Sequence, residues 1–107
     1  MARIKEKTQC PVAATLQLIG GRWKAIILYT LTTGTKRFGE IAVRIPVISR
    51  KVLTEQLKEL EADGLILRVQ YKEIPPRVEY SLTEMGKSLS SVFHEMEIWG
   101  NVNVLAN

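Results

Sequence analysis

Residues 49–65 read SRKVLTEQLKELEADGL, and this stretch decides the fold. Ser49 offers a hydroxyl of the kind that caps a helix N-terminus. Leucines follow at positions 53, 57 and 60, the i, i+4, i+7 spacing that places side chains on one face of an α-helix. Asp63 and Gly64 then form a stop signal. The stretch predicts a helix over residues 49–62, about 14 residues long, that buries its leucine face in a core.

The opposite face of this helix is polar. With the leucines inward, the step of 100° per residue turns Lys51, Thr54, Glu55 and Lys58 outward, and Ser49 and Arg50 stand at the leading end. A helix anchored on one side can lie in the major groove of DNA, which is about 12 Å wide. The outward residues other than Glu55 are donors suited to phosphates and base edges. Glu55 would face phosphates unless it accepts from a cytosine amino group or pairs with Lys51 or Lys58, and its role stays open.

Glycine and proline divide the rest of the chain into further elements. A helix is expected to begin at Pro11, with Val12, Leu16 and Ile19 at helical spacing, and to end at Gly20. A buried helix is expected within residues 22–34, where the apolar stripe consists of Trp23, Ile26, Ile27 and Leu31. Residues 37–45 predict a short helix with its apolar face at Phe38, Ile41, Ala42 and Ile45, before Pro46 forces a turn.

From Leu65 onward, the apolar residues no longer follow helical spacing but recur at every second position, as in a β-strand. Leu65, Leu67, Val69 and Tyr71 alternate with Ile66, Arg68, Gln70 and Lys72, and a second alternation runs from Arg77 to Leu82. These two runs predict a β-hairpin. Thr83 can cap a last helix that ends at Gly100. The order of elements is that of a winged helix-turn-helix, a mainly α fold with a small β-hairpin.

Length and composition limit the classes of protein that fit. The 107 residues suffice for a single domain, which we expect to span residues 1–107 and to carry helices for dimerisation at both ends. Cys10 is the only cysteine, and the start MARIKEKTQ lacks the apolar stretch of a secretory signal. The most apolar run, residues 25–31, is far shorter than the ~20 residues of a membrane span. We therefore expect a cytoplasmic protein that crosses no membrane.

Positive charge gathers around the predicted helix-turn-helix. The chain carries a net charge of +4, and residues 36–51 alone hold five basic residues against the single acid Glu40. In the hairpin, the outward register is expected to hold Arg68, Lys72 and Arg77, beside the neighbouring phosphates or minor groove. Although a solvated face explains most single charges, the group predicts a DNA-binding surface. Its expected members are Lys36, Arg37, Ser49, Arg50, Lys51, Thr54, Lys58, Arg68, Lys72 and Arg77.

Several motifs in combination carry a family resemblance. They are CPVAATLQLIGGRWKAIILYTL, the RFGEI segment, ISRKVLTEQLKELEADGLI, and a hairpin ending PPRVEYSLTEMGKSL. From about Cys10 to Gly100, the chain resembles the HxlR-type transcriptional regulators, relatives of the MarR group. The resemblance implies a homodimer that binds operator DNA, pairs through its first and last helices and inserts the helix of residues 49–62. It also implies that Cys10 is a candidate redox sensor, because some members sense oxidants or electrophiles through a cysteine in this region.

Cys10 has two interpretations from its surroundings in sequence. It can pack as a small apolar residue, as buried free cysteines commonly do. Alternatively, a helix N-terminus together with Lys5, Lys7 and Arg22 would favour the reactive thiolate. His94 is the only histidine and has no cysteine near it in sequence, so we expect no metal, no cofactor and no catalysis. The sequence does not identify a small-molecule effector.

The last helix predicts a dimer seam. Met85, Leu89, Val92, Met96 and Trp99 follow a 4-3-4-3 spacing of two heptads, which is too short for a free coiled coil, so Leu16 and Ile19 of the first helix should complete the contact. The alternative is that the stripe packs on its own domain, and core packing is also expected of Trp23 and Trp99. Two other functions remain open: a protein–protein interaction module whose basic face meets an acidic partner, and a small thiol enzyme dependent on Cys10.

Overall fold

Helix α4 (Arg50–Ala62) confirms the prediction for the leucine stretch. In the computed structural model, which describes residues 7–106, the Ser49 hydroxyl accepts a hydrogen bond from the Val52 backbone N–H at 3.1 Å. Leu53, Leu57 and Leu60 are all buried. The Asp63–Gly64 turn ends the helix, and Gly64 adopts a φ of +79°, a conformation that favours glycine.

Three helices precede α4 and carry much of the core. They are α1 (Pro11–Ile19), α2 (Lys24–Leu31) and α3 (Phe38–Arg44), at the predicted places. The buried face of α2 is rotated from the predicted stripe, because Leu28 is buried and Ile26 is exposed. The contacts explain the rotation: α2 packs against α1, α3 and the sheet, and these neighbours together enclose Ile27, Leu28 and Leu31.

The predicted hairpin is confirmed and belongs to a larger sheet. Strands β2 (Ile66–Tyr71) and β3 (Arg77–Leu82) pair antiparallel from Ile66 opposite Leu82 to Tyr71 opposite Arg77. A third strand, β1 (Lys36–Arg37), pairs with β3 and gives the order β1-β3-β2. Sequence periodicity did not predict β1, because two residues are too few to show an alternation.

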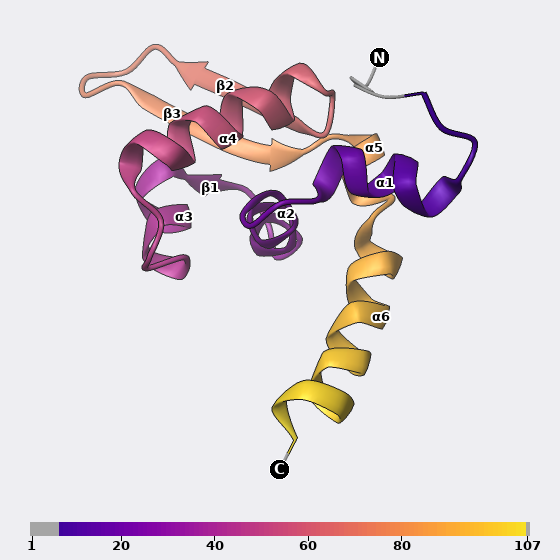
Figure 1. Ribbon diagram of the computed structural model, residues 1–107. Helices are drawn as coiled ribbons and strands as arrows, with labels where there is room; N and C mark the ends of the chain where they lie inside the picture. The colour runs from indigo at the N-terminus through magenta and orange to yellow at the C-terminus, as the bar shows by residue number, and fades with distance from the viewer. Residues whose placement is uncertain (1–6, 107) are drawn as a thin grey trace.

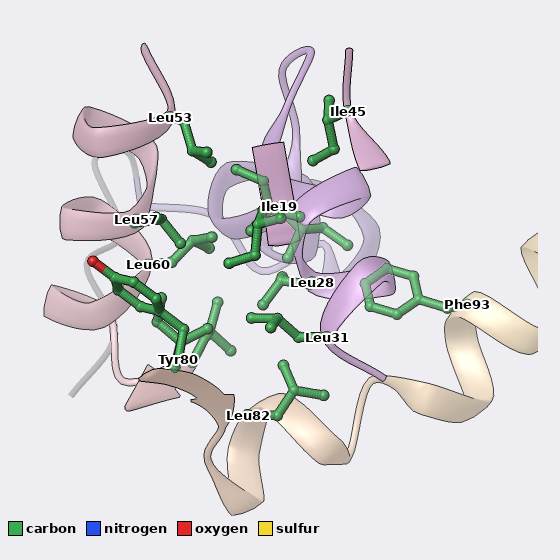
Figure 2. Close-up of a cluster of buried hydrophobic side chains, with 14 residues drawn as sticks. Ile19, Leu28, Leu31, Ile45, Leu53, Leu57, Leu60, Tyr80, Leu82 and Phe93 are labelled. Carbon is green, nitrogen blue, oxygen red and sulfur yellow. The ribbon is translucent and has the colours of Figure 1, made fainter. Parts of the chain in front are cut away.

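The core lies between the sheet and the helices. Tyr80 of β3 lies beside Leu57 and Leu60 of α4, Leu82 lies nearer Leu31 of α2, and Phe93 of α6 enters the cluster from another side (Figure 2). Leu65 and Ile66 are both buried, whereas Leu67 is half exposed although its alternation grouped it with Leu65. The strand begins only at Ile66, so the two faces of the sheet are counted from that residue rather than from Leu65.

The C-terminal region differs most from the prediction of one helix from Thr83 to Gly100. It forms the short α5 (Glu84–Lys87), then α6 (Ser90–Gly100), and the chain continues through a π-helical turn (Asn101–Leu105). Gly100 keeps helical backbone angles and therefore does not end the helix. Helix α6 projects away from the sheet and from α4 (Figure 1). Within residues 7–106, no helix is long and apolar enough to cross a membrane.

Helix α5 is held tightly against the start of the sheet, whereas α6 beyond it projects away (Figure 1). The Thr83 hydroxyl donates to the Gly64 carbonyl at 2.6 Å and accepts from the Gly86 N–H at 3.1 Å. Gly86 is buried so closely against the start of β2 that a Cβ built on it would lie 2.2 Å from the Leu65 carbonyl oxygen. The position thus accepts glycine alone, and α5 is fixed where the sheet begins.

Replacing Gly86 by alanine should therefore destabilise the fold. We expect Gly86→Ala to lower the free energy of unfolding by about 1 to 3 kcal/mol, the usual effect of overpacking against rigid backbone. Gly100→Ala is the matched control: its added Cβ meets nothing within 4 Å. The control should be neutral or gain roughly 0.5 to 1 kcal/mol. Urea denaturation measures both, and equal stabilities of the two variants would contradict the close contact.

Candidate nucleic-acid interface

The outer face of α4 presents the predicted polar side chains. Arg50, Lys51, Thr54, Glu55 and Lys58 are all exposed, as is the capping residue Ser49. The Arg50 guanidinium lies over the Phe38 ring at 4.7 Å, so an aromatic residue of α3 orients it. The Thr54 hydroxyl donates to the Arg50 carbonyl at 2.8 Å, which leaves its oxygen free to act as an acceptor. Residues Ser49–Lys51, the leading end of α4, thus combine exposed positive charge with a partly fixed geometry.

Helix α3 and the turn after it hold the leading end in place. Ile41 and Ile45 are buried, so α3 is anchored through the face that its sequence predicted. The Arg37 backbone N–H donates to Glu40 Oε1 at 2.8 Å, and Arg44 Nη1 donates to the Glu40 carbonyl at 3.0 Å. The Arg37 side chain remains exposed beside this end of the helix. The helix-turn-helix therefore brings Arg37 and the leading end of α4 to one side of the molecule.

Lys36 does not join this surface. Its side chain is buried in β1, and its Nζ donates to the Thr33 hydroxyl at 2.9 Å. Lys36 was predicted to contact DNA because its charge belongs to the basic cluster in sequence. The pairing of β1 with β3 turns the residue inward instead, so the structure corrects this assignment and gives Lys36 a structural role.

The hairpin of β2 and β3, here called the wing, divides its basic residues between two faces. Residues directly opposite in an antiparallel pair share a face. Arg68 lies opposite Tyr80 and Arg77 opposite Tyr71, which places the two arginines on opposite faces of the wing. Arg68 and Lys72 are exposed. The prediction of one outward register for Arg68, Lys72 and Arg77 is wrong, because Arg68 shares the face of Ile66 and Tyr80, which are buried, whereas Arg77 lies on the other face.

Arg77 is further constrained by its neighbours. Its guanidinium stacks over the Tyr71 ring at 4.0 Å, while Nη2 pairs with Glu73 at 2.8 Å and Nη1 pairs with Glu79 at 3.0 Å. The side chain is half-buried rather than projecting from the wing. Two carboxylates thus already compensate the charge that was expected to face phosphates.

An ion pair that the sequence did not predict joins α4 to α2. Lys24 Nζ of α2 lies 2.6 Å from Glu59 Oε1 of α4, and the two side chains are 13% and 39% exposed. Because most of this lysine is shielded from water, the pair is screened less than an ordinary surface pair. The residues lie 35 positions apart, and no local pattern could have signalled the contact.

Comparison with known proteins assigns this architecture to a family. The family described as HxlR-like helix-turn-helix matches residues 18–106. The chain belongs to the HxlR-like family. It is 54% identical over 91 residues to the uncharacterized HTH-type transcriptional regulator YdeP of Bacillus subtilis (strain 168), over 85% of this chain and 71% of YdeP.

Solved structures agree with the family assignment. The redox regulator HypR in its oxidized form matches with a TM-score of 0.83 and 49% identity, over 88% of this chain and 97% of HypR. A regulator assigned to the MarR family, from Porphyromonas gingivalis W83, matches with a TM-score of 0.87 and 38% identity, over 95% and 100% of the two chains. This HxlR-like chain is therefore a transcriptional regulator of the helix-turn-helix type, with a winged-helix fold.

Cys10 of this HxlR-like chain lies near the N-terminus, just before α1, and is exposed. It occupies the N-cap position of α1, and its backbone N–H donates to the Thr8 hydroxyl at 3.1 Å. Exposure contradicts the interpretation that Cys10 packs in the core. Of the basic residues expected near it, Lys7 is exposed, Arg22 stacks over Trp23 at 4.5 Å, and Lys5 lies outside the described residues.

The predicted seam of the last helix is only partly continuous. Val92, Met96 and Trp99 are exposed along α6, and Leu16 is exposed on α1. These residues of α6 are therefore not buried in their own domain, so the core packing expected of Trp99 is wrong, whereas Trp23 does pack against the core. Three expected seam residues have other environments: Ile19 is buried in the core, Leu89 packs half-buried against it, and Met85 lies on the separate α5.

A polar contact that the sequence did not reveal joins α6 to α2. The Tyr29 hydroxyl donates to the Glu97 carboxylate, and His94 Nδ1 lies 3.9 Å from the other carboxylate oxygen. The hydrogen bond to Glu97, and then the nearby negative charge, raise the pKa of Tyr29 above its ordinary value of 10.0. The Tyr29 ring also meets Phe93 edge-on, at 6.3 Å between centroids. In the described part of the chain, no three His, Cys, Asp or Glu side chains gather as a metal site.

Proposed function

We propose that the chain binds operator DNA sequence-specifically as a homodimer, with α4 in the major groove. The observation that carries this proposal is the division of α4 into a buried leucine face and an exposed face with Arg50 and Lys51 at its leading end. A helix so anchored presents its N-terminal side chains to base edges while the core fixes its rotation. We further propose that the chain regulates by binding, without catalysis or a bound cofactor, in the cytoplasm, where the operator DNA lies.

The proposed contact surface is smaller than the sequence predicted. It retains the exposed members of the basic cluster: Arg37, Ser49, Arg50, Lys51, Thr54, Lys58, Arg68 and Lys72. Lys36 is omitted because it is buried, and Arg77 because two carboxylates compensate its charge. The alternative function, an interaction module for an acidic protein, would use the same face. A shift of duplex DNA that depends on salt and survives excess nonspecific competitor favours the first function.

Removing a side chain from the leading end of α4 should weaken specific binding. We expect Arg50→Ala or Lys51→Ala to lower affinity for a selected operator by about 1 to 3 kcal/mol, the effect of losing a good base contact. Lys87→Ala on α5 makes the same change of charge at an exposed site outside the helix-turn-helix and should leave affinity nearly unchanged. Equilibrium titration at physiological salt measures all three. Unchanged affinity in both α4 variants would contradict the placement of this helix.

The exposed stripe of α6 supports the homodimer. Val92, Met96 and Trp99 together form an apolar surface that continues into Val102 and Leu105 of the π-helical turn. Leu16 on α1 adds a further exposed apolar side chain. A contiguous apolar surface on a small domain marks an association site. A two-fold dimer would set its two recognition helices about 34 to 36 Å apart, which matches an inverted repeat with half-sites one helical turn apart.

A charge in the middle of this surface should separate the subunits without unfolding them. Met96 is half exposed, so we expect Met96→Glu to remain folded by circular dichroism but to sediment as a monomer and to bind operator much more weakly. Lys87→Glu, a charge change on α5, should stay dimeric. Sedimentation of the unmodified protein as a monomer at micromolar concentration would contradict the dimer.

A response to oxidants is a second proposal for the same protein. Cys10 is exposed, as a reactive thiol must be, and the structural relative HypR is described as a redox regulator. We propose that modification of this thiol by a mild oxidant or electrophile changes the affinity for operator DNA. The position at the start of α1 would transmit the change through the helix that carries Leu16.

Cys10→Ser tests this response directly. The variant should bind operator like the unmodified protein but should not respond to oxidant, because a hydroxyl cannot undergo thiol oxidation. Thiol titration of the native protein, with operator binding measured before and after treatment, provides the measurement. A thiol that stays unmodified, or whose modification leaves binding unaltered, would contradict the sensor role.

A further inference from the structure

Glu55 occupies the middle of the exposed face of α4. Each residue of an α-helix turns the chain by about 100°, so Glu55 projects about 200° from Leu53, almost opposite the buried leucines. The exposed Lys51 and Lys58 lie on the same face, about one helical turn before and after it. Glu55 is therefore a carboxylate between two lysines, at the part of α4 that lies furthest from the core.

No contact inside the domain accounts for this carboxylate. Within residues 7–106, Glu55 forms no ion pair and no hydrogen bond, although Lys51 and Lys58 stand at helical spacing from it. Glu59 of the same helix behaves differently, because its Oε1 lies 2.6 Å from Lys24 Nζ. The acceptor atoms of Glu55 are thus available to a partner outside the domain, whereas those of Glu59 serve the contact with α2.

The chemistry of the major groove limits what a carboxylate can bind there. With α4 in the groove, the middle of its outer face meets the base edges, and its flanks meet the phosphates. Phosphate oxygens, guanine N7 and O6, and thymine O4 are acceptors, which a carboxylate avoids. The amino groups of cytosine and adenine are the donors, and adenine carries the acceptor N7 beside its amino group. Cytosine is therefore the base that suits Glu55 best.

We propose that Glu55 reads a cytosine in each half-site of the operator by accepting a hydrogen bond from its N4 amino group. This inference rests on the proposed function, since α4 must occupy the major groove. Lys51 and Lys58 compensate the negative charge, so the surface still attracts phosphates. Glu55 determines specificity in two ways: it favours cytosine, and it repels thymine, which presents the acceptor O4 where cytosine has its amino group.

Paired substitutions in the protein and in the operator test this contact. The full-length protein and Glu55→Ala would each select duplexes from a random pool. The unmodified protein should select a cytosine at one position of each half-site, and Glu55→Ala should lose that preference alone. Replacing this C·G pair by T·A should weaken binding of the unmodified protein about tenfold, the effect of losing one good base contact. The same replacement should hardly change binding of Glu55→Ala, because the contact is already missing.

Glu61→Ala is the matched control. Glu61 is also an exposed carboxylate of α4, but it lies near the end of the helix and projects only about 80° from Leu53. Both variants lose one negative charge and should gain similar affinity for nonspecific DNA. Glu61→Ala should keep the preference for cytosine. Both substitutions lie at exposed helical positions, and circular dichroism verifies the fold.

Two results would overturn the inference. One is that Glu55→Ala selects the same bases as the unmodified protein, and the other is that the T·A replacement weakens both proteins equally. Either result would leave Glu55 as a charge that only moderates nonspecific binding. If the unmodified protein selects no duplex at all, the proposed function itself fails.

Discussion

The burial of three leucines on one face of α4 is the constraint on which the rest of the structure depends. Leu53, Leu57 and Leu60 are inaccessible to water. Each such side chain contributes roughly 1.5 to 3 kcal/mol when it is fully buried. Any rotation of the helix about its axis would expose them, so the core fixes which residues point outward. The polar face of α4 is thus set by the apolar one.

Two polar contacts connect α4, through α2, to the C-terminal helix α6. The Lys24–Glu59 pair joins α4 to α2, and the Tyr29–Glu97 hydrogen bond joins α2 to α6. Helix α2 is therefore in polar contact with the helix proposed to read DNA and with the helix proposed to form the dimer. Helix α2 buries Ile27, Leu28 and Leu31 in the core, so it forms a packed connection between these two helices.

Folding decides which of the basic side chains remain available for binding. The net charge of +4 suggests a broadly basic protein, yet several basic side chains are engaged internally. Lys36 is buried against Thr33, Lys24 pairs with Glu59, and Arg77 pairs with two acids. Much of the positive charge that remains exposed lies on α3, on α4 and along β2 to Lys72 at the tip of the wing. A chain of modest net charge can in this way present a strongly basic patch in one place.

The sequence by itself determined the elements that depend on local periodicity and capping. The leucine spacing, Ser49 and the Asp63–Gly64 stop predicted α4 with its inward face, and the alternation after Leu65 predicted the wing. Only the tertiary structure decided the features that depend on distant neighbours. Strand β1 exists because β3 lies beside it, and the pairing of β2 with β3 places Arg68 on the face of the buried Tyr80, away from Arg77. The close packing of Gly86 on Leu65, residues that are 21 positions apart, holds α5 against the start of β2. Local spacing fixes the face of a helix, whereas pairing across the chain fixes which side chains remain free to bind.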